Sequence, residues 1–130
     1  MNNSYTVESL YQEELYVLNP KVLIILPMPW EEVDESDQLL LAKILGSVKI
    51  NLASVQILAY AEFRINDLTI YNPSKILVFG SRISDQKAPI KPYQPSIENK
   101  VTVLQADSLH QLDDSKKKSL WTALKEMFAI

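Results

Sequence analysis

The residues of this chain that could do chemistry gather in one loop, Pro27-Met28-Pro29-Trp30-Glu31-Glu32, and in the acidic stretch after it. The densest acidic group of the sequence comprises Glu31, Glu32, Asp34, Glu35 and Asp37. Paired carboxylates can act as general acid and base, or can bind Mg²⁺. The same pattern is typical of a helix start, where acidic side chains compensate the partial positive charge of the backbone N–H groups. We favour this second interpretation.

Trp30 lies in the same loop and is a candidate partner-binding residue. An aromatic side chain in a loop that follows a strand can mark a binding surface, because it offers a large apolar area. The alternative, which we favour, is that Trp30 anchors the loop on the hydrophobic core. The two interpretations differ in how much of the indole ring reaches solvent.

Other catalytic motifs are missing from the sequence. The chain has no cysteine, and His110 is its single histidine, so the common zinc sites are excluded. Gly46 and Gly80 are the two glycines, too few for a dinucleotide-binding or phosphate-binding loop. A phosphorelay receiver domain would need acidic residues where the first strand ends in Leu26-Pro27-Met28. No serine stands in an evident nucleophile elbow with a histidine base. We therefore predict no catalytic residue, no metal and no cofactor.

Bulk composition narrows the class of protein. A length of 130 residues fits one domain, and 47% hydrophobic residues can fill a core. The net charge of −3 argues against a dedicated nucleic-acid surface. The one basic cluster, Lys116-Lys117-Lys118, is interpreted as a solvated helix face. The N-terminus does not resemble a signal peptide, and no apolar run could span a bilayer, so we expect a cytoplasmic protein without membrane contact.

Four apolar segments predict β-strands, at residues 21–26, 55–60, 75–80 and 101–104. The first and third lack alternation, which is typical of central strands covered on both faces. Capping and periodicity predict helices over about residues 34–48 and from Asp113 or Asp114 onward. Strands alternating with helices predict an α/β domain at 19–130. Its expected form is a three-layer α/β/α arrangement with a mostly parallel, four-stranded sheet and helices on both faces.

Several local expectations accompany this fold. Gly80 is expected to permit a sharp exit from its strand, and Gly46 to end its helix or mark a close packing point. Residues 81–100 are expected to form an exposed loop with room for one edge strand. Apolar side chains are expected to face inward from the loop and helical turn at 61–74, namely Ile65, Leu68 and Ile70. The last helix is expected to dock through Leu120, Trp121, Leu124 and Phe128.

Residues 1–18 are predicted to form a separate N-terminal arm or short helix. Its apolar side chains recur at helical spacing, and they are Val7, Leu10, Tyr11 and Leu15. They are too few to require burial in the core of the domain, so the arm is a candidate partner-binding segment. A helix packed permanently on the sheet is the alternative.

The order of the segments along residues 20–128 matches that of a known fold family. The matching positions are the loop at 26–32, the leucine-rich helix at 39–45, the strand ending in Phe79-Gly80, the segment Ala106-Asp107-Ser108-Leu109, and Trp121 in the last helix. This layout resembles the uracil-DNA glycosylase fold. In those enzymes the third strand ends in a Leu-Gly-type turn, and a later strand leads to His-Pro-Ser. Ala106 stands at the position of that histidine, and alanine cannot stabilise a developing anion on a leaving base.

The loss of the catalytic motif resembles one non-enzymatic branch of this fold, the psi subunits of bacterial DNA polymerase III. Their size, their N-terminal arm and an ending such as Leu120-Trp121-Thr122-Ala123-Leu124 are shared features. The resemblance implies an adaptor in DNA replication, with clamp-loader and chi-like subunits as partners and no strong direct binding to nucleic acid. The alternative is a diverged glycosylase-like enzyme that acts on nucleic acid.

Overall fold

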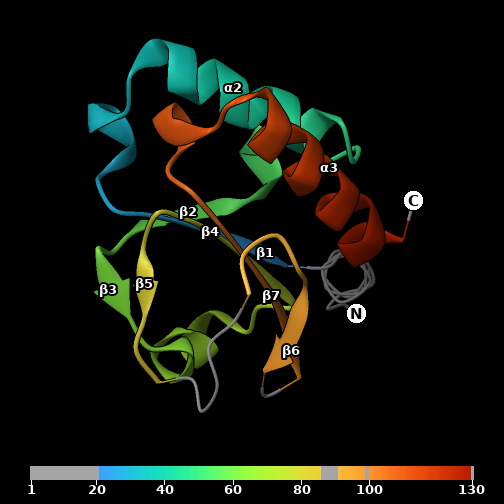
Figure 1. Ribbon diagram of the computed structural model, residues 1–130. Helices are drawn as coiled ribbons and strands as arrows, with labels where there is room; N and C mark the ends of the chain where they lie inside the picture. The colour runs from blue at the N-terminus through green and yellow to red at the C-terminus, as the bar shows by residue number, and fades with distance from the viewer. Residues whose placement is uncertain (1–20, 86–90, 99, 130) are drawn as a thin grey trace, which may run out of the picture.

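The computed structural model describes residues 21–85, 91–98 and 100–129. At its centre is a five-stranded sheet in the order β2-β1-β4-β7-β6 (Figure 1). The strands are β1 (Val22–Leu26), β2 (Gln56–Ala59), β4 (Lys75–Phe79), β6 (Ser96–Glu98) and β7 (Val101–Ala106). The first four in spatial order run parallel, and β6 pairs antiparallel with β7. The prediction of a four-stranded sheet is short by one strand, and the added strand, β6, is the edge strand for which residues 81–100 were expected to have room.

The two segments predicted as central strands are the most buried of the sheet. All five residues of β1 are buried, and so are the last four of β4. In the parallel register, Ile24 lies beside Leu77, which in turn lies beside Leu104. Both faces of these strands are covered, which is why their sequences show no alternation of polar and apolar residues.

Both α-helices of the described residues lie on one face of the sheet (Figure 1). They are α2 (Glu35–Gly46), after β1, and α3 (Asp114–Phe128), after β7. Leu41 and Leu45 of α2 and Leu120 and Leu124 of α3 are buried in one cluster with Ile24 and its neighbours in the sheet. Asp113 caps α3, its side chain accepting a hydrogen bond from the Lys116 N–H at 2.8 Å, as predicted.

The opposite face is covered by a 3-10 helix, η3 (Ile65–Tyr71), and by a small parallel sheet of β3 (Glu62–Phe63) and β5 (Arg82–Ile83). Among the described residues, the expectation of helices on both faces is thus met by α-helices on one face and by a 3-10 helix on the other. Parallel crossovers are nearly always right-handed, so connections that run in opposite directions along the sheet pass over opposite faces. The connection from β2 back to β4 runs opposite to that from β1 to β2, and it is too short for a long helix.

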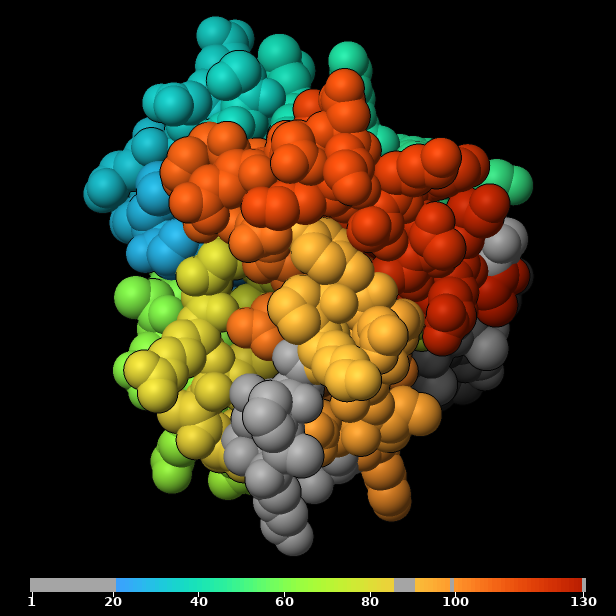
Figure 2. All heavy atoms as spheres, viewed as in Figure 1, coloured from blue at the N-terminus to red at the C-terminus, as the bar shows by residue number. Residues whose placement is uncertain are grey.

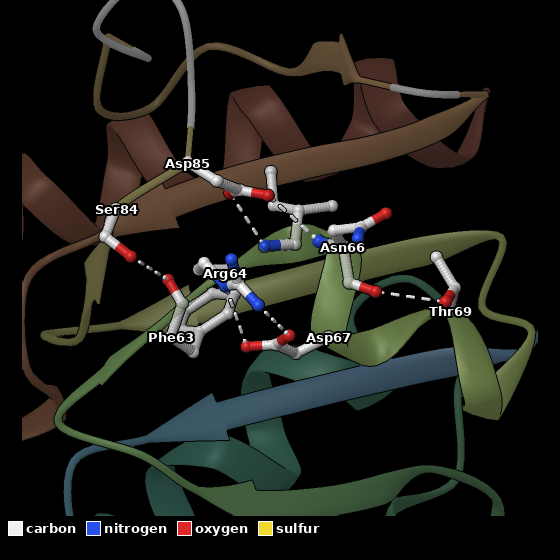
Figure 3. A network of polar contacts seen from close by, with 8 residues as sticks. Phe63, Arg64, Asn66, Asp67, Thr69, Ser84 and Asp85 are labelled. Carbon is white, nitrogen blue, oxygen red and sulfur yellow. Dashed lines mark hydrogen bonds and ion pairs between the residues drawn. The ribbon is translucent and has the colours of Figure 1, made fainter.

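Side chains hold this second layer in place (Figure 3). The Asp85 carboxylate accepts hydrogen bonds from the backbone N–H groups of Ile65, at 2.8 Å, and Asn66, at 3.0 Å. Ser84 donates through its hydroxyl to the Phe63 carbonyl at 3.2 Å, beside the β3–β5 pairing. Asp85 therefore fastens the end of β5 to the first turn of η3, 20 residues earlier in the chain.

Three local expectations are corrected by the structure. Ile70 is 81% exposed, because η3 winds as a 3-10 helix and turns that side chain away from the sheet. Trp121 is 46% exposed, since it lies at the border of the buried stripe of α3 rather than within it. The close-packing alternative for Gly46 is wrong, because a Cβ there would meet nothing within 4 Å, whereas its other alternative is confirmed, since α2 ends at this residue.

Candidate functional site

The ends of the parallel strands bring three loops to one edge of the sheet, which we call the carboxyl edge. β1 continues into Pro27-Met28, β4 into Gly80-Ser81 and β7 into Asp107-Ser108. The Gly80 N–H donates to the Ala106 carbonyl at 3.0 Å, so the β4 and β7 loops leave the sheet together. In parallel α/β proteins this edge is where ligands usually bind. The segments that resemble the glycosylase motifs in sequence, at 26–32, 79–80 and 106–109, also lie at this edge.

Gly80 brings the β4 loop against the β7 loop. Its φ is +86°, a conformation that side chains rarely adopt, and it provides the sharp exit predicted from the sequence. A Cβ on Gly80 would lie 2.2 Å from the Ser108 hydroxyl oxygen and 3.1 Å from the Ser108 Cβ. The two loops therefore meet at Gly80 with no room for a side chain at that position.

The hollow that remains at the carboxyl edge is small. It is lined by the end of β1 and its loop, by the last residue of β4, by the segment after β7 and by residues at and before the start of α2, namely Leu26, Pro27, Met28, Val33, Asp37, Phe79, Ser108, Leu109 and His110. Its volume of about 20 Å³ holds a single water molecule. Sites for small organic ligands usually measure about 300–1,000 Å³. Met28 is one of the side chains that line this space.

Trp30 is half-buried and packs against the core cluster on the α2 side of the sheet. It begins the 3-10 helix η1 (Trp30–Glu32), and its carbonyl accepts a hydrogen bond from the Gln38 amide at 2.9 Å. The loop is thereby tied to the second turn of α2. This placement agrees with an anchoring role for Trp30.

The acidic group after Trp30 surrounds the start of α2 without forming a cluster. Glu31, Glu32, Asp34 and Glu35 are exposed, whereas Asp37 is half-buried beside the small hollow. Asp34 precedes the first helical residue as expected, but its side chain makes no capping hydrogen bond. Within the described ranges, no three His, Asp or Glu side chains are arranged to hold a metal ion.

A polar cluster at the end of β7 escaped the sequence reasoning. The Tyr93 hydroxyl donates a hydrogen bond to the Asp107 carboxylate and accepts one from the Asp107 N–H at 3.3 Å. Lys116 Nζ lies 3.4 Å from the same carboxylate. In Figure 2 the gold segment that leads into β6 lies directly against the orange start of α3. No local signal predicts this contact, because Tyr93 and Asp107 are 14 residues apart.

The surroundings of Tyr93 and Asp107 determine which of the two groups carries a proton at neutral pH. Burial and the hydrogen bond to Asp107 raise the pKa of Tyr93 to about 12. The hydrogen bond from Tyr93, with the positive charge of Lys116, lowers the pKa of the Asp107 carboxyl, against the opposing effect of its burial. At neutral pH the tyrosine is protonated and the aspartate ionised, an arrangement that fastens a loop. Tyr93 has a left-handed backbone, with φ of 64°, which this anchoring helps to hold.

Ser81 is the buried polar residue of this edge. The hydroxyl oxygen of Ser81 is buried and makes no hydrogen bond to any of the described residues. The Gln105 amide instead donates to the Ser81 carbonyl at 3.3 Å. Ser81 is 3% exposed and is not among the residues that line the hollow at this edge.

The remaining candidates from the sequence are placed as follows. The N-terminal arm, with Val7, Leu10, Tyr11 and Leu15, lies outside the described residues. His110 is exposed, as predicted for a surface histidine. Lys117 and Lys118 are exposed on α3, which agrees with a solvated helix face. Neither α-helix in the described part of the chain combines the length and apolarity needed to cross a membrane.

Comparisons of the chain with protein-family models, with curated proteins and with solved structures found no match.

Proposed function

We propose that this chain is a non-enzymatic adaptor of the psi-subunit type, which joins other proteins of the bacterial replication machinery. The observation that carries the proposal is the closed carboxyl edge. Gly80 and Ser108 are in contact there, and the space beside Met28 measures about 20 Å³. A flipped nucleobase needs a pocket far larger than this.

The segment that resembles the catalytic motif supports the same proposal. Ala106 replaces the histidine of that motif and is buried at the end of β7. The neighbouring Asp107 is engaged by Tyr93 and Lys116, so its carboxylate is held in a loop contact rather than offered to a substrate. The residues at this edge thus act as structural supports.

The N-terminal arm is the first candidate for partner binding in this proposal. A segment with a few apolar side chains at helical spacing can fold onto a partner and bury those side chains at that moment. Clamp-loader and chi-like subunits are the partners we expect. Trp30, packed against the core, offers less to a partner than the arm does.

Affinity purification of the tagged full chain from bacterial cells tests the proposal. We expect clamp-loader or chi-like subunits to co-purify, and a Leu10→Ser/Tyr11→Ser variant to lose them with its melting temperature unchanged. The chain should release no uracil from a labelled single-stranded oligonucleotide. Uracil release that is abolished by Asp107→Asn would instead establish the glycosylase-like alternative.

A further inference from the structure

A hollow larger than the one at the carboxyl edge lies between α2 and α3. We call it the α2–α3 groove. Its lining residues are Leu40, Lys43, Ile44, Ser47, Lys117, Leu120, Trp121 and Leu124. It has a volume of about 180 Å³, against about 20 Å³ at the carboxyl edge. The lining residues recur every three or four positions along α2 and along α3, so they form two facing rows. A groove between two such rows could hold a third helix.

The floor of the groove is apolar and partly open to solvent. Leu120 and Leu124 are buried beneath it, while Ile44 is half-buried and Trp121 is 46% exposed. Tryptophan is the side chain that most often dominates the binding energy of a protein interface when a partner buries it. Because the Trp121 ring is about half exposed and lines a hollow, this surface is better suited to docking a partner than to being part of the hydrophobic core.

The rim of the groove is basic. Lys43 and Lys117 line it, no lining residue is acidic, and Lys125 Nζ lies 4.2 Å from the centroid of the Trp121 ring. The whole chain has a net charge of −3, so this surface departs from the average of the molecule. Asp114, which is the first residue of α3 and lies one turn before Lys117, does not line the groove. The charge of the rim is complementary to carboxylates.

We propose that the α2–α3 groove binds an acidic amphipathic helix of a protein partner. Its apolar stripe would lie on the floor beside Trp121, and its carboxylates would face Lys43, Lys117 and Lys125. The lining positions span about two turns of each helix, so about two to three turns of the partner would be engaged. This inference rests on the proposed adaptor function and gives it a second contact surface, separate from the N-terminal arm.

The test uses the full chain with Trp30→Phe, so that fluorescence reports on Trp121 alone. The probe is a synthetic helical peptide of about 16 residues, roughly four turns, with leucines along one face and glutamates on its flanks. We expect a saturable change in Trp121 fluorescence and an affinity that falls as salt is added. Lys43→Glu/Lys117→Glu should weaken binding at least about fivefold, because each change replaces an attraction by a repulsion.

The matched control is Lys91→Glu/Lys100→Glu, which changes the net charge equally at exposed lysines outside the groove. It should bind the probe nearly as well as the parent. Equal weakening by both pairs would overturn the proposal, as would equal binding of a probe with lysines in place of its glutamates. Self-association of the chain that blocks the probe would assign the groove to a second copy instead.

One other occupant has to be distinguished, the acidic N-terminal segment of this chain. If the probe binds only after Leu10→Ser, the groove holds that segment and the proposal is wrong. The two proposals fail separately. Loss of probe binding with replication proteins still co-purifying would refute the groove alone, whereas probe binding without those proteins would refute the proposed function alone.

Discussion

Replacing Gly80 by alanine tests the closed carboxyl edge, because the new methyl group must enter the contact between the β4 and β7 loops. The φ of +86° at Gly80 costs an alanine roughly 1–2 kcal/mol. The Ser108 hydroxyl, 2.2 Å from the new Cβ, can rotate away, but the Ser108 Cβ and Cα at 3.1 and 3.2 Å cannot. Overpacking of this kind costs about 1–3 kcal/mol. We expect Gly80→Ala to destabilise the domain by about 2–5 kcal/mol, a large part of a typical total of about 5–15 kcal/mol.

The measurement is urea unfolding followed by circular dichroism and by tryptophan fluorescence, with the midpoint and slope fitted for each variant. Gly46→Ala is the matched control, because a Cβ there meets nothing within 4 Å and lies at the end of a helix. We expect that control to be unchanged or stabilised by up to about 1 kcal/mol. An unchanged midpoint for Gly80→Ala would refute the contact described here.

A second substitution separates the two contributions. Ser108→Gly removes the Ser108 Cβ and hydroxyl but leaves the Cα at 3.2 Å, so the double variant with Gly80→Ala should regain part of the packing loss and keep the backbone loss. In a double-mutant cycle the two changes should couple by about 1 kcal/mol or more. Strictly additive effects would show that the two loops do not touch.

Three further predictions concern packing, capping and pH. Leu124→Ala should cost about 2–5 kcal/mol, because the side chain is fully buried, whereas Trp121→Ala should leave the domain folded with a much smaller loss in the same urea experiment. Asp85→Ala removes the acceptor for two backbone N–H groups of η3 and should cost about 1–2 kcal/mol; hydrogen exchange should accelerate in η3 first. The raised pKa of Tyr93, about 12, means that its contribution to stability is complete below pH 10 and is lost as pH rises towards 12. Asp107, with a lowered pKa, contributes above its usual value of 3.8 and loses that contribution as pH falls below it. Spectroscopic titration of tyrosine, with Asp107→Asn as the comparison, should show the high pKa moving towards 10.

Short-range patterns in the sequence were sufficient for the four parallel strands and for the two α-helices of the described residues. The unbroken apolar runs in β1 and β4 predicted central strands, because a strand covered on both faces can hold no alternating polar residue. Asp113 was predictable as a cap, because its acceptor is three residues from the N–H that it serves. Each of these predictions depends on residues that lie close together in the sequence.

Tertiary structure alone decided how the elements face one another. The periodicity of α3 marks an apolar stripe, but whether Trp121 at its border is buried depends on how far α2 extends over it, and it does not extend far enough. Likewise, Tyr93 meets Asp107 only because β6 folds back antiparallel on β7 and sets the loop beside α3. Such contacts join residues that are distant in the chain, and their geometry follows from crossover direction and strand order, which no local pattern encodes.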